Sequence, residues 1–576
     1  MRYEPDQSPP HGLAVALAAQ KVALIVSGIV LTPVIVLRAG GSPADMIAWS
    51  IFMALLVSGV TTFMQAKPLG RLGAGYVLFM GTSGAFISVG VDALKAGGMA
   101  LLGALVVFSS LIQFVMAGRL ATLRRLVTPT VGGTTIMLIG VAVIPIAFGL
   151  LEDVPASVRT ATPLAPLAAS LLTFGVIVGL NMFGSRKLRL WSPLLGLIAG
   201  MLVCIPYGLV DTRPVTAAAW VGLPALTWPG VDLSFGHEFW SLLPAFIIVT
   251  LVGAIETYGD GIAIQKVSWR KPRAVDFRAV QGALYVDAIG NLLSGLGGTL
   301  PNTTYSTSIS TVEMTGVAAR RVGMYGGLLL GLLAFSPKVS ALLLMVPNPV
   351  VGAYLLVLIV LLFMHGLQVA LEDGFTLDKA LVVGLSLWLG MGFQQQKIFH
   401  DLIPDWASGL LGNGMVAGTL VAVLLTSLLQ LKGGVATRLE TTLEMRSLGA
   451  LQALARKRAE ALHWDESSAQ RIELALEEAL ALLVEHAGNA GSPAPRLRLE
   501  VRAVLGALEV ELIGLPLGVN LNDLPAAALR AETGPEDALL GLRVLEAMVE
   551  DLRHQQYHGI DFLSFRVVPR EAVTRV

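Results

Sequence analysis

The sequence predicts an all-α domain embedded in a membrane, followed by a small soluble domain. Hydrophobic residues make up 54% of the 576 residues and charged residues only 14%, whereas soluble domains carry about 25% charged residues. Apolar runs of about 20 residues, the length needed to cross a hydrocarbon core of about 30 Å, recur before residue 433. Residues 433–576, by contrast, hold 36 of the 80 charged side chains. We therefore divide the chain into an N-terminal tail (1–11), a membrane domain (12–432) and a soluble domain (433–576).

The apolar runs predict fourteen membrane segments. Their bounds are roughly 12–37, 46–66, 74–91, 97–118, 127–149, 163–183, 191–210, 239–264, 279–297, 303–319, 322–336, 349–367, 380–394 and 412–431. Loops after even-numbered segments, up to the twelfth, hold 16 Lys and Arg residues, and loops after odd-numbered segments hold six. Because basic residues are enriched in cytoplasmic loops, we expect a multi-pass protein of the cell (inner) membrane. Both termini and the soluble domain are then cytoplasmic.

The membrane domain also carries a weak internal repeat. GTS at 81–83 is matched by GT at 298–299, an offset of 217, and PTVG at 129–132 is matched by PVVG at 349–352, an offset of 220. Two matches at nearly one offset predict a repeat of seven plus seven segments. An odd number of segments per repeat inverts the second copy, which is the plan of secondary transporters with sites at broken helices near the midplane.

The third and tenth segments contain the small and polar residues that break membrane helices. GTSGAF occupies 81–86, and LGGTLPNTTYSTSIS occupies 296–310. Unpaired backbone at membrane depth is tolerated only where it is buried in protein or lines a cavity. The alternative is a close helix–helix contact made by small residues. Because both copies of the repeat show the feature, we favour a cavity.

Acidic residues inside apolar segments are candidates for function, because a charge at the centre of a membrane helix costs roughly 2.5–3.5 kcal/mol. Glu256 is the leading candidate, and Asp260 follows four residues later on the same helical face. Two such carboxylates can share or relay a proton, and a carboxylate can accept N–H groups from a planar heterocycle. The alternatives are a structural pair with another helix for Glu256 and a solvated helix end near Lys266 for Asp260.

The membrane segments contain three further charged positions of interest. Asp287 and Asn291 share one face of the ninth segment, either within the site or as hydrogen-bonding groups that fix a neighbouring helix. Lys21 either extends to the cytoplasmic surface, which we favour, or pairs with a buried carboxylate. Glu313 lies six residues beyond Thr307, about 240° around a helix, and should face away from the cavity.

The sequence indicates no other chemistry. It has no cluster of metal ligands, no Walker loop and no nucleophile–base arrangement, so we predict no metal, no cofactor and no enzymatic activity. The formal net charge of zero gives no reason to expect nucleic acid. The single cysteine, Cys204, lies in an apolar stretch and should be a buried small hydrophobic residue.

Three motifs of the membrane domain occur together: GTS-x-x-F at 81–86, a Glu followed by Gly-Asp at 256–260, and GTLPNTTYS at 298–306 followed by TGVAARR at 315–321. With these motifs, residues 12–432 resemble the nucleobase–ascorbate transporter family, the xanthine/uracil permeases. The resemblance implies a core and a gate domain, short strands in the third and tenth segments, proton- or sodium-coupled uptake of a nucleobase and a homodimer. By match, the substrate-binding residues would be Glu256, Gly81, Thr82, Ser83, Phe86, Tyr305, Ser306, Thr307 and Ser308, and the coupling residues Glu256, Asp260 and Asp287.

Two pairs of residues depart from the family pattern. Thr307 and Ser308 stand where family members place Gln or Glu followed by Asn, and the usual Gln-His pair of the first segment is Gln20-Lys21. In the family, the Gln or Glu at the position of Thr307 normally contacts the second edge of the base. A threonine hydroxyl offers fewer contacts there than an amide or a carboxylate. The difference favours another heterocycle, or a smaller compound, over xanthine or uracil.

Residues 440–576 resemble the ATP-binding domain of anti-sigma-factor serine kinases. RIELALEEALALLVEHA at 471–487, with Glu478, resembles the ATP-site helix, 509–521 falls where the Asp-x-Gly loop belongs, and 541–567 resembles the last helix and strand. However, Leu482 replaces the magnesium-holding Asn, and the nucleotide-reading Asp falls at Leu512-Ile513-Gly514. We therefore expect a regulatory α/β module that binds ATP weakly or not at all. A simple α/β domain that binds a protein partner is the alternative.

These observations leave three functional hypotheses, in order of preference. The first is ion-coupled uptake of a nucleobase-like heterocycle, with Glu256 central to binding and coupling. The second is a sulfate-permease-like anion transporter that exploits the helix ends of the third and tenth segments. The third is a membrane sensor that relays substrate occupancy through the soluble domain to a partner.

Overall fold

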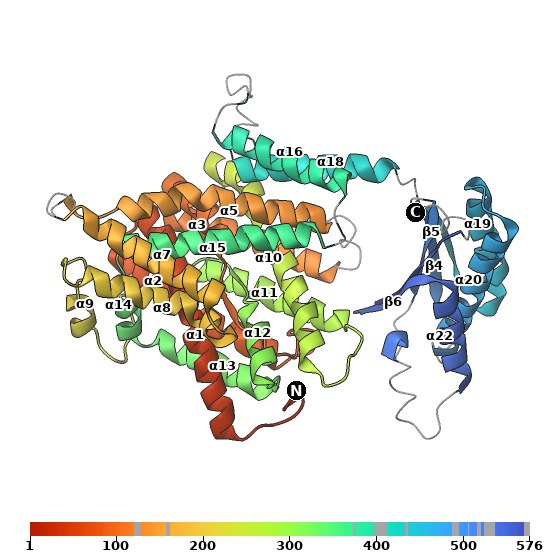
Figure 1. The fold of residues 1–576 in the computed structure, drawn as a ribbon, viewed down its shortest axis with the longest axis horizontal. Coiled ribbons are helices and arrows are strands. Elements are labelled where there is room, and N and C mark those ends of the chain that lie inside the picture. The colour runs from red at the N-terminus through yellow and green to blue at the C-terminus, as the bar shows by residue number, and fades with distance from the viewer. Residues whose placement is uncertain are drawn as a thin grey trace. The chain divides into compact units, whose positions relative to one another are not determined.

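The computed structural model forms two compact units, Met1–Arg270 with Ala279–Thr426, and Lys271–Arg278 with Ser427–Val576 (Figure 1). It describes residues 1–119, 128–156, 162–372, 374, 376–395, 398, 411, 413–432, 436–486, 495–504, 506–514, 520–523 and 536–569. Parts of the predicted fifth and fourteenth segments and of the 509–521 loop lie outside the described residues. The second unit therefore contains, besides the C-terminal region, a short stretch from the middle of the chain.

The first unit is almost entirely helical. Its helices are α1 (His11–Ala39), α2 (Ala44–Ala66), α3 (Ile87–Gly118), α5 (Pro129–Glu152), α7 (Leu164–Phe183), α8 (Arg186–Cys204), α9 (Arg213–Ala217), α10 (His237–Ser268), α11 (Phe277–Gly297), α12 (Thr307–Thr315), α13 (Arg320–Ala334), α14 (Pro337–Leu344), α15 (Asn348–Ala370), α16 (Leu377–Gln394) and α18 (Gly414–Lys432). By length and composition, eight helices of the described chain could cross a membrane, and α13 with α14, bent by 80°, could form a ninth span. The chain is thus a mostly helical, multi-pass membrane protein, while the seven-plus-seven arrangement stays a prediction.

The end of the third predicted segment, residues 87–91, is continuous with the fourth segment in the structure. Both belong to one helix, α3, whose backbone is non-helical at Gly97 and Gly98. Gly98 has a φ of 72°, a left-handed conformation that glycine adopts readily. The boundary predicted from the sequence is therefore a kink within α3.

Small residues bring pairs of helices into close contact. A Cβ added to Gly133 of α5 would lie 2.3 Å from the backbone oxygen of Gly366 on α15, and one added to Gly59 of α2 would lie 2.7 Å from the oxygen of Gly327 on α13. Such contacts are typical of membrane interfaces, where association depends on close packing. The first of them pairs two helices, α5 and α15, that form one wall of the cavity described below.

Two short strands interrupt the helices, as the family resemblance implies. Strand β1 (Met80–Thr82) pairs antiparallel with β2 (Asn302–Thr304), with Gly81 opposite Thr303. The short 3-10 helix η1 (Gly84–Phe86) follows β1 and leads into α3. The strands expected in the third and tenth segments are confirmed.

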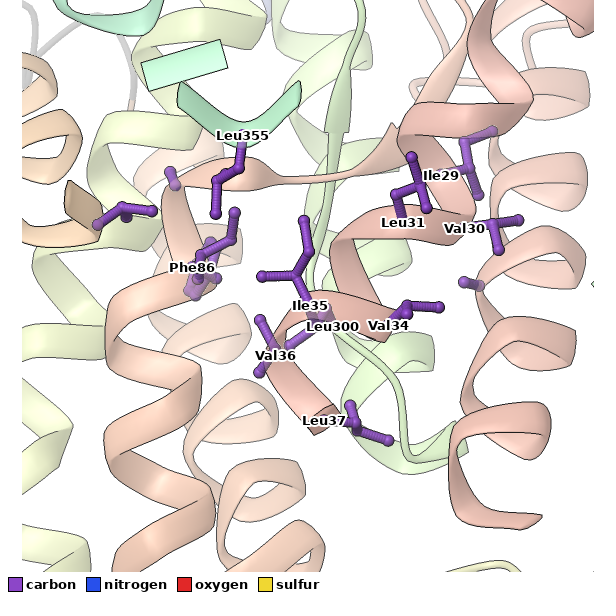
Figure 2. Packing of buried hydrophobic residues seen from close by; sticks show 14 of the residues in the cluster. Ile29, Val30, Leu31, Val34, Ile35, Val36, Leu37, Phe86, Leu300 and Leu355 are labelled. Atoms are coloured by element: carbon purple, nitrogen blue, oxygen red, sulfur yellow. The ribbon is translucent and has the colours of Figure 1, made fainter. Parts of the chain in front are cut away.

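The broken segments rest on apolar side chains from several elements. Figure 2 shows the second half of α1, including Ile35 and Val36, packed near Phe86 of η1, Leu300 and Leu355 of α15. These side chains are at most 1% exposed. The break in the helices is therefore surrounded by close-packed hydrocarbon, which fixes the ends of the strands in place.

The second unit contains a five-stranded antiparallel sheet with the order β3-β4-β5-β7-β6. The strands are β3 (Thr437–Thr442), β4 (Arg496–Val504), β5 (Ala507–Gly514), β6 (Glu550–Tyr557) and β7 (Ile560–Val567). The helices α19 (Leu448–Ala461), α20 (Glu466–His486) and α22 (Glu536–Met548), with the 3-10 turns η3 (Met445–Ser447) and η4 (Leu521–Asp523), complete it. Leu480 of α20, Leu499 of β4 and Leu563 of β7 share its hydrophobic core.

One detail of the C-terminal region differs from the prediction. Residues 541–567, expected to hold a last helix and a single strand, contain the end of α22 and two strands, β6 and β7. Gly559, with a φ of 88°, lies in the turn between them, and a positive φ is what tight hairpin turns require. The prediction missed the His558-Gly559 turn and read the hairpin as one strand.

The stretch Lys271–Arg278 contacts other residues of the sheet unit. The N–H of Ala274 donates to Asp523 Oδ1 at 2.7 Å. Asp276 forms a parallel bridge with Gln556 of β6, and the ring of Phe277 stacks on Tyr557 with centroids 5.1 Å apart. This stretch is also the connection between α10 and α11 along the chain.

Candidate functional site

The two broken segments lie side by side at the strand pair, and their backbone groups are hydrogen-bonded to each other. The N–H of Ser83 donates to the oxygen of Pro301 at 2.8 Å, and the N–H of Tyr305 donates to the oxygen of Phe79 at 2.9 Å. The N–H of Phe79 donates to Ser308 Oγ at 2.9 Å. Non-helical backbone can persist at membrane depth only when its polar groups are satisfied in this way.

Gly81, Thr82 and Tyr305 hold this junction together. A Cβ at Gly81 would lie 2.6 Å from the ring of Tyr305 and 2.8 Å from Ile29, so only glycine fits there. The hydroxyl of Tyr305 donates to the oxygen of Thr82 at 2.9 Å, and the hydroxyl of Thr82 donates to the oxygen of Ile29 at 2.9 Å. These predicted site residues thus connect β1, β2 and α1.

A cavity of about 640 Å³ opens beside the junction. Among the predicted site residues, Glu256, Asp260 and Ser306 line it. Its other polar lining residues are Gln113, Thr128, Tyr258, Lys266, His365, Gln368 and Glu372. Pockets of this size, largely apolar with a few convergent polar groups, are the usual form of small-molecule sites.

The two acids of α10 have different surroundings in this cavity. Asp260 accepts hydrogen bonds from the hydroxyls of Thr304 at 2.7 Å and Ser306 at 2.8 Å. Glu256, one helical turn away, lies beside Thr303 of β2. Asp260 is therefore tied to the tenth segment through two hydroxyls, while Glu256 borders both the strand pair and the open cavity.

Asp287 and Asn291 of α11 form a separate hydrogen-bonded network. Asp287, fully buried, accepts from Gln113 Nε2 at 2.7 Å and from Thr257 Oγ1 at 3.1 Å. Asn291 donates to Gln113 Oε1 at 2.7 Å and accepts from the N–H of Asn302 at 2.6 Å. Two interpretations were given for Asp287 and Asn291. These contacts agree with the one in which the pair forms hydrogen bonds that fix neighbouring elements.

The remaining predicted substrate-binding residues do not line the cavity. Phe86 is 1% exposed and its ring lies 5.9 Å from that of Phe246. Ser83 is also 1% exposed, and within the described chain its hydroxyl has no hydrogen-bond partner. Ser308 is buried with its hydroxyl occupied by Phe79, and Thr307 begins α12 with an exposed side chain.

Two predictions about charged residues have opposite outcomes. Lys21 does not extend to the surface: it is 3% exposed, its Nζ has no hydrogen-bond partner among the described residues, and it lies 5.9 Å from the ring centroid of Phe79. The favoured interpretation of Lys21 is therefore wrong, because helix α13 and the broken segment cover this face of α1. Glu313, by contrast, forms an exposed ion pair with Arg186 at 2.7 Å, away from the cavity as predicted.

The contribution of α15 to the cavity was not predicted from the sequence. His365, Gln368 and Glu372 occur near the cytoplasmic end predicted for that segment, where polar residues are usually solvated. Their spacing of three and four residues on a very apolar helix was the available signal. Within the described chain, no group of three or more His, Cys, Asp and Glu side chains is placed to hold a metal ion.

Comparisons with known proteins identify the membrane domain. The chain is 27% identical over 419 residues to a putative purine permease of Clostridium perfringens, which covers 72% of this chain and 90% of that protein. It is 27% identical over 439 residues to the xanthine permease XanP of Escherichia coli, covering 73% of this chain and 93% of that protein. A nucleobase transporter of Paenibacillus larvae is 27% identical over 428 residues, covering 72% of this chain and 93% of that protein.

Solved structures of membrane transporters also match, with TM-scores below 0.5. The transmembrane domain of a cyanobacterial bicarbonate transporter, BicA, matches with a TM-score of 0.47 at 16% identity, covering 73% of this chain and 99% of that chain. SLC26A9 matches with a TM-score of 0.48 at 11% identity, covering 75% of this chain and 67% of that chain.

A family model described as a permease family, that of the xanthine and uracil permeases, matches residues 12–398. The match ends before the soluble domain, so the resemblance of residues 440–576 to anti-sigma-factor kinases stays a prediction. The matched range contains the strand pair, both acids of α10 and the whole lining of the cavity. The chain belongs to the xanthine/uracil permease family, whose members are transporters.

Proposed function

We propose that the protein takes up a nucleobase-like heterocycle across the membrane, coupled to protons or sodium, with Glu256 both binding the substrate and taking part in coupling. Asp260 and Asp287 are the accompanying coupling residues. The relatives described as purine, xanthine and nucleobase transporters support the substrate class. A homodimer is part of this proposal because the family resemblance implies one.

The observation that carries the proposal is the presence of two carboxyl groups, Glu256 and Asp260, on one face of α10 in a single cavity. A carboxylate accepts hydrogen bonds and donates none, so it complements the N–H edge of a planar heterocycle. An anion entering the same cavity would meet like charges, which repel by several kcal/mol at an interface. The cavity therefore favours a heterocycle over sulfate-like substrates.

The same acids give a physical reason for cation coupling. An uncompensated carboxylate in a membrane interior is costly, about 2.5 kcal/mol or more on insertion scales. A proton or sodium ion that arrives with the substrate removes this cost when the loaded site crosses the membrane. Asp260 retains two hydroxyl donors, Thr304 and Ser306, whereas Glu256 borders the open cavity. Glu256 is accordingly the residue whose charge changes with substrate.

Uptake by purified protein in proteoliposomes tests this function. Radiolabelled purines and pyrimidines should accumulate under a proton or sodium gradient, whereas sulfate and bicarbonate should not. Glu256→Gln should lower uptake by about 10- to 100-fold, since a hydrogen bond to a charged group contributes about 1.5–3 kcal/mol. Glu313→Gln is the matched control, because Glu313 pairs with Arg186 at the surface.

Two results would contradict the proposal. The first is heterocycle accumulation that Glu256→Gln leaves unchanged. The second is uptake of an anion by a protein that does not transport heterocycles and is not inhibited by them. This result would favour the anion-transporter alternative. Heterocycle binding with no measurable flux would instead favour the membrane-sensor alternative.

A further inference from the structure

Most hydrogen-bonding groups that line the cavity are already engaged by the protein. Gln113 spans Asp287 and Asn291. Ser306 donates to Asp260, and Thr128 accepts from the N–H of Val131 at the start of α5. A substrate held at Glu256 by its N–H edge must therefore find partners for its opposite edge among other residues.

In the family, the position of Thr307 contacts this second edge, but in this protein the side chains of Thr307 and Ser308 are not available for that role. Ser308 is buried and its hydroxyl accepts the N–H of Phe79. Neither Thr307 nor Ser308 lines the cavity. Because an unpaired buried polar group of a ligand costs binding energy, the missing partner must come from elsewhere on the cavity wall.

Two groups on α15 meet this requirement. His365 and Gln368 line the cavity, and no hydrogen bond joins either side chain to another part of the described chain. They lie three residues apart and so project from one side of the helix. Polar side chains in a membrane helix almost always face a protein interior or a water-filled cavity. An imidazole and a carboxamide each donate and accept hydrogen bonds, as the mixed edge of a heterocycle requires.

We propose that His365 and Gln368 contact the edge of the substrate that faces away from Glu256 and determine which heterocycles the transporter accepts. This inference rests on the proposed function, because it assigns specificity to the same cavity. The substrate is then held between an acidic wall on α10 and an amide–imidazole wall on α15. The amide that the tenth segment lacks is supplied from α15.

Selectivity of uptake is the first test. In proteoliposomes, His365→Ala and Gln368→Ala should raise the KM for the transported heterocycle about 5- to 10-fold, the loss expected for one neutral hydrogen bond. The loss should be smaller for analogues that lack the carbonyl or ring nitrogen contacted by the deleted group. Val360→Ala is the control, because Val360 is 56% exposed and absent from the cavity lining. An equal loss for every analogue, or no loss, would overturn the inference.

Chemical accessibility provides a second test without transport. Cys204 is buried and is the only cysteine, so Cys204→Ala gives a cysteine-free background. In that background, the His365→Cys and Gln368→Cys variants of detergent-purified protein should react with a water-soluble maleimide. The transported heterocycle should slow this reaction several-fold, whereas the Val360→Cys variant should show no protection.

The outcomes separate the two proposals. If the wild-type protein takes up a heterocycle through Glu256 but neither α15 variant shows altered selectivity or protection, this inference alone fails. If the wild-type protein takes up no heterocycle, the proposed function fails and this inference fails with it.

Discussion

Asp287 has no exposed surface and accepts hydrogen bonds from Gln113 of α3 and Thr257 of α10. Replacing it with alanine would leave an amide and a hydroxyl without their acceptor in the protein interior. An unsatisfied buried donor costs about 1–3 kcal/mol, so Asp287→Ala should lower the thermal unfolding temperature of detergent-purified protein by several degrees. Asp287→Asn, which keeps an oxygen for one donor, should lose less. Unchanged stability in both variants would show that the network does not support the site.

At the residue scale, the sequence identified the acids but not their partners. Glu256 and Asp260 stood out because charge inside an apolar segment is costly, a property visible without coordinates. His365 and Gln368 were missed, because a histidine and a glutamine near a helix end are common at a membrane surface. Lys21 was misplaced for a related reason: whether a long side chain reaches water depends on which helix covers it. Such contacts join residues that are distant in sequence.

Gly81 offers a prediction about the strand pair as an element. A Cβ there would lie 2.6 Å from the ring of Tyr305, whose hydroxyl also bonds Thr82. Gly81→Ala should therefore displace Tyr305 and separate β1 from β2, with a cost of about 1–3 kcal/mol for overpacking. Uptake and thermal stability should both fall.

Gly84 is the matched control for that variant. It lies three residues further along the same broken segment, and an added Cβ would have no neighbour closer than 4.0 Å. Gly84→Ala should retain uptake and stability. If the two alanine variants behaved alike, the close approach of Tyr305 to β1 would not be what constrains the junction.

The end of α1 makes a second interaction between elements. Arg38 donates to the oxygens of Leu344 at 2.6 Å and Val346 at 3.2 Å, and to Asn348 Oδ1 at 2.6 Å. Asn348 in turn donates to Asp153 Oδ2 at 2.7 Å. This one guanidinium thus connects α1 to the turn between α14 and α15.

Arg38→Lys should weaken that connection although it keeps the charge. An ammonium cannot reproduce the forked geometry of a guanidinium, so we expect a loss of about 1–2 kcal/mol in stability, measured as a lower unfolding temperature. Lys338→Arg is a control, since Lys338 lies over Trp220 as a single cation. Equal unfolding temperatures for wild type and Arg38→Lys would show that charge alone matters at this position.

At the element scale, the sequence predicted the positions of the helices well and their breaks less well. Runs of apolar residues locate α1, α2 and α15 because length and hydropathy suffice for a spanning helix. The pairing of β1 with β2 came from the family resemblance, since strands of three residues leave almost no periodic signal. The β6–β7 hairpin was missed because its turn, His558-Gly559, is short and lies within an otherwise continuous pattern.

At the scale of the whole molecule, the main result that could not be predicted from the sequence is which segments of the chain make up the second unit. The boundary in charge predicts a separate domain at residues 433–576. The compact unit that contains the C-terminal sheet also includes Lys271–Arg278. This stretch continues directly into α11, which carries Asp287, and follows α10, which carries Glu256 and Asp260.

Hydrogen exchange can test whether the soluble unit holds this stretch. The amide of Ala274 donates to the carboxylate of Asp523, and a hydrogen bond to a charged group contributes about 1.5–3 kcal/mol. Asp523→Ala should therefore speed exchange within residues 271–278 by about 10- to 100-fold, measured by mass spectrometry on full-length protein. Asp551→Ala removes an exposed carboxylate elsewhere in the unit and should leave that peptide unchanged.

Transport measured on the same two variants tests whether the second unit influences uptake. Residues 271–278 do not line the cavity, so loosening them should not alter the hydrogen bonds made to substrate, and the KM of Asp523→Ala should equal that of wild type. The maximal uptake rate should change, because this stretch is the chain connection from α10 to α11 and both helices carry acids of the proposed coupling set. Faster exchange with an unaltered maximal rate would mean that the unit binds the stretch without influencing transport.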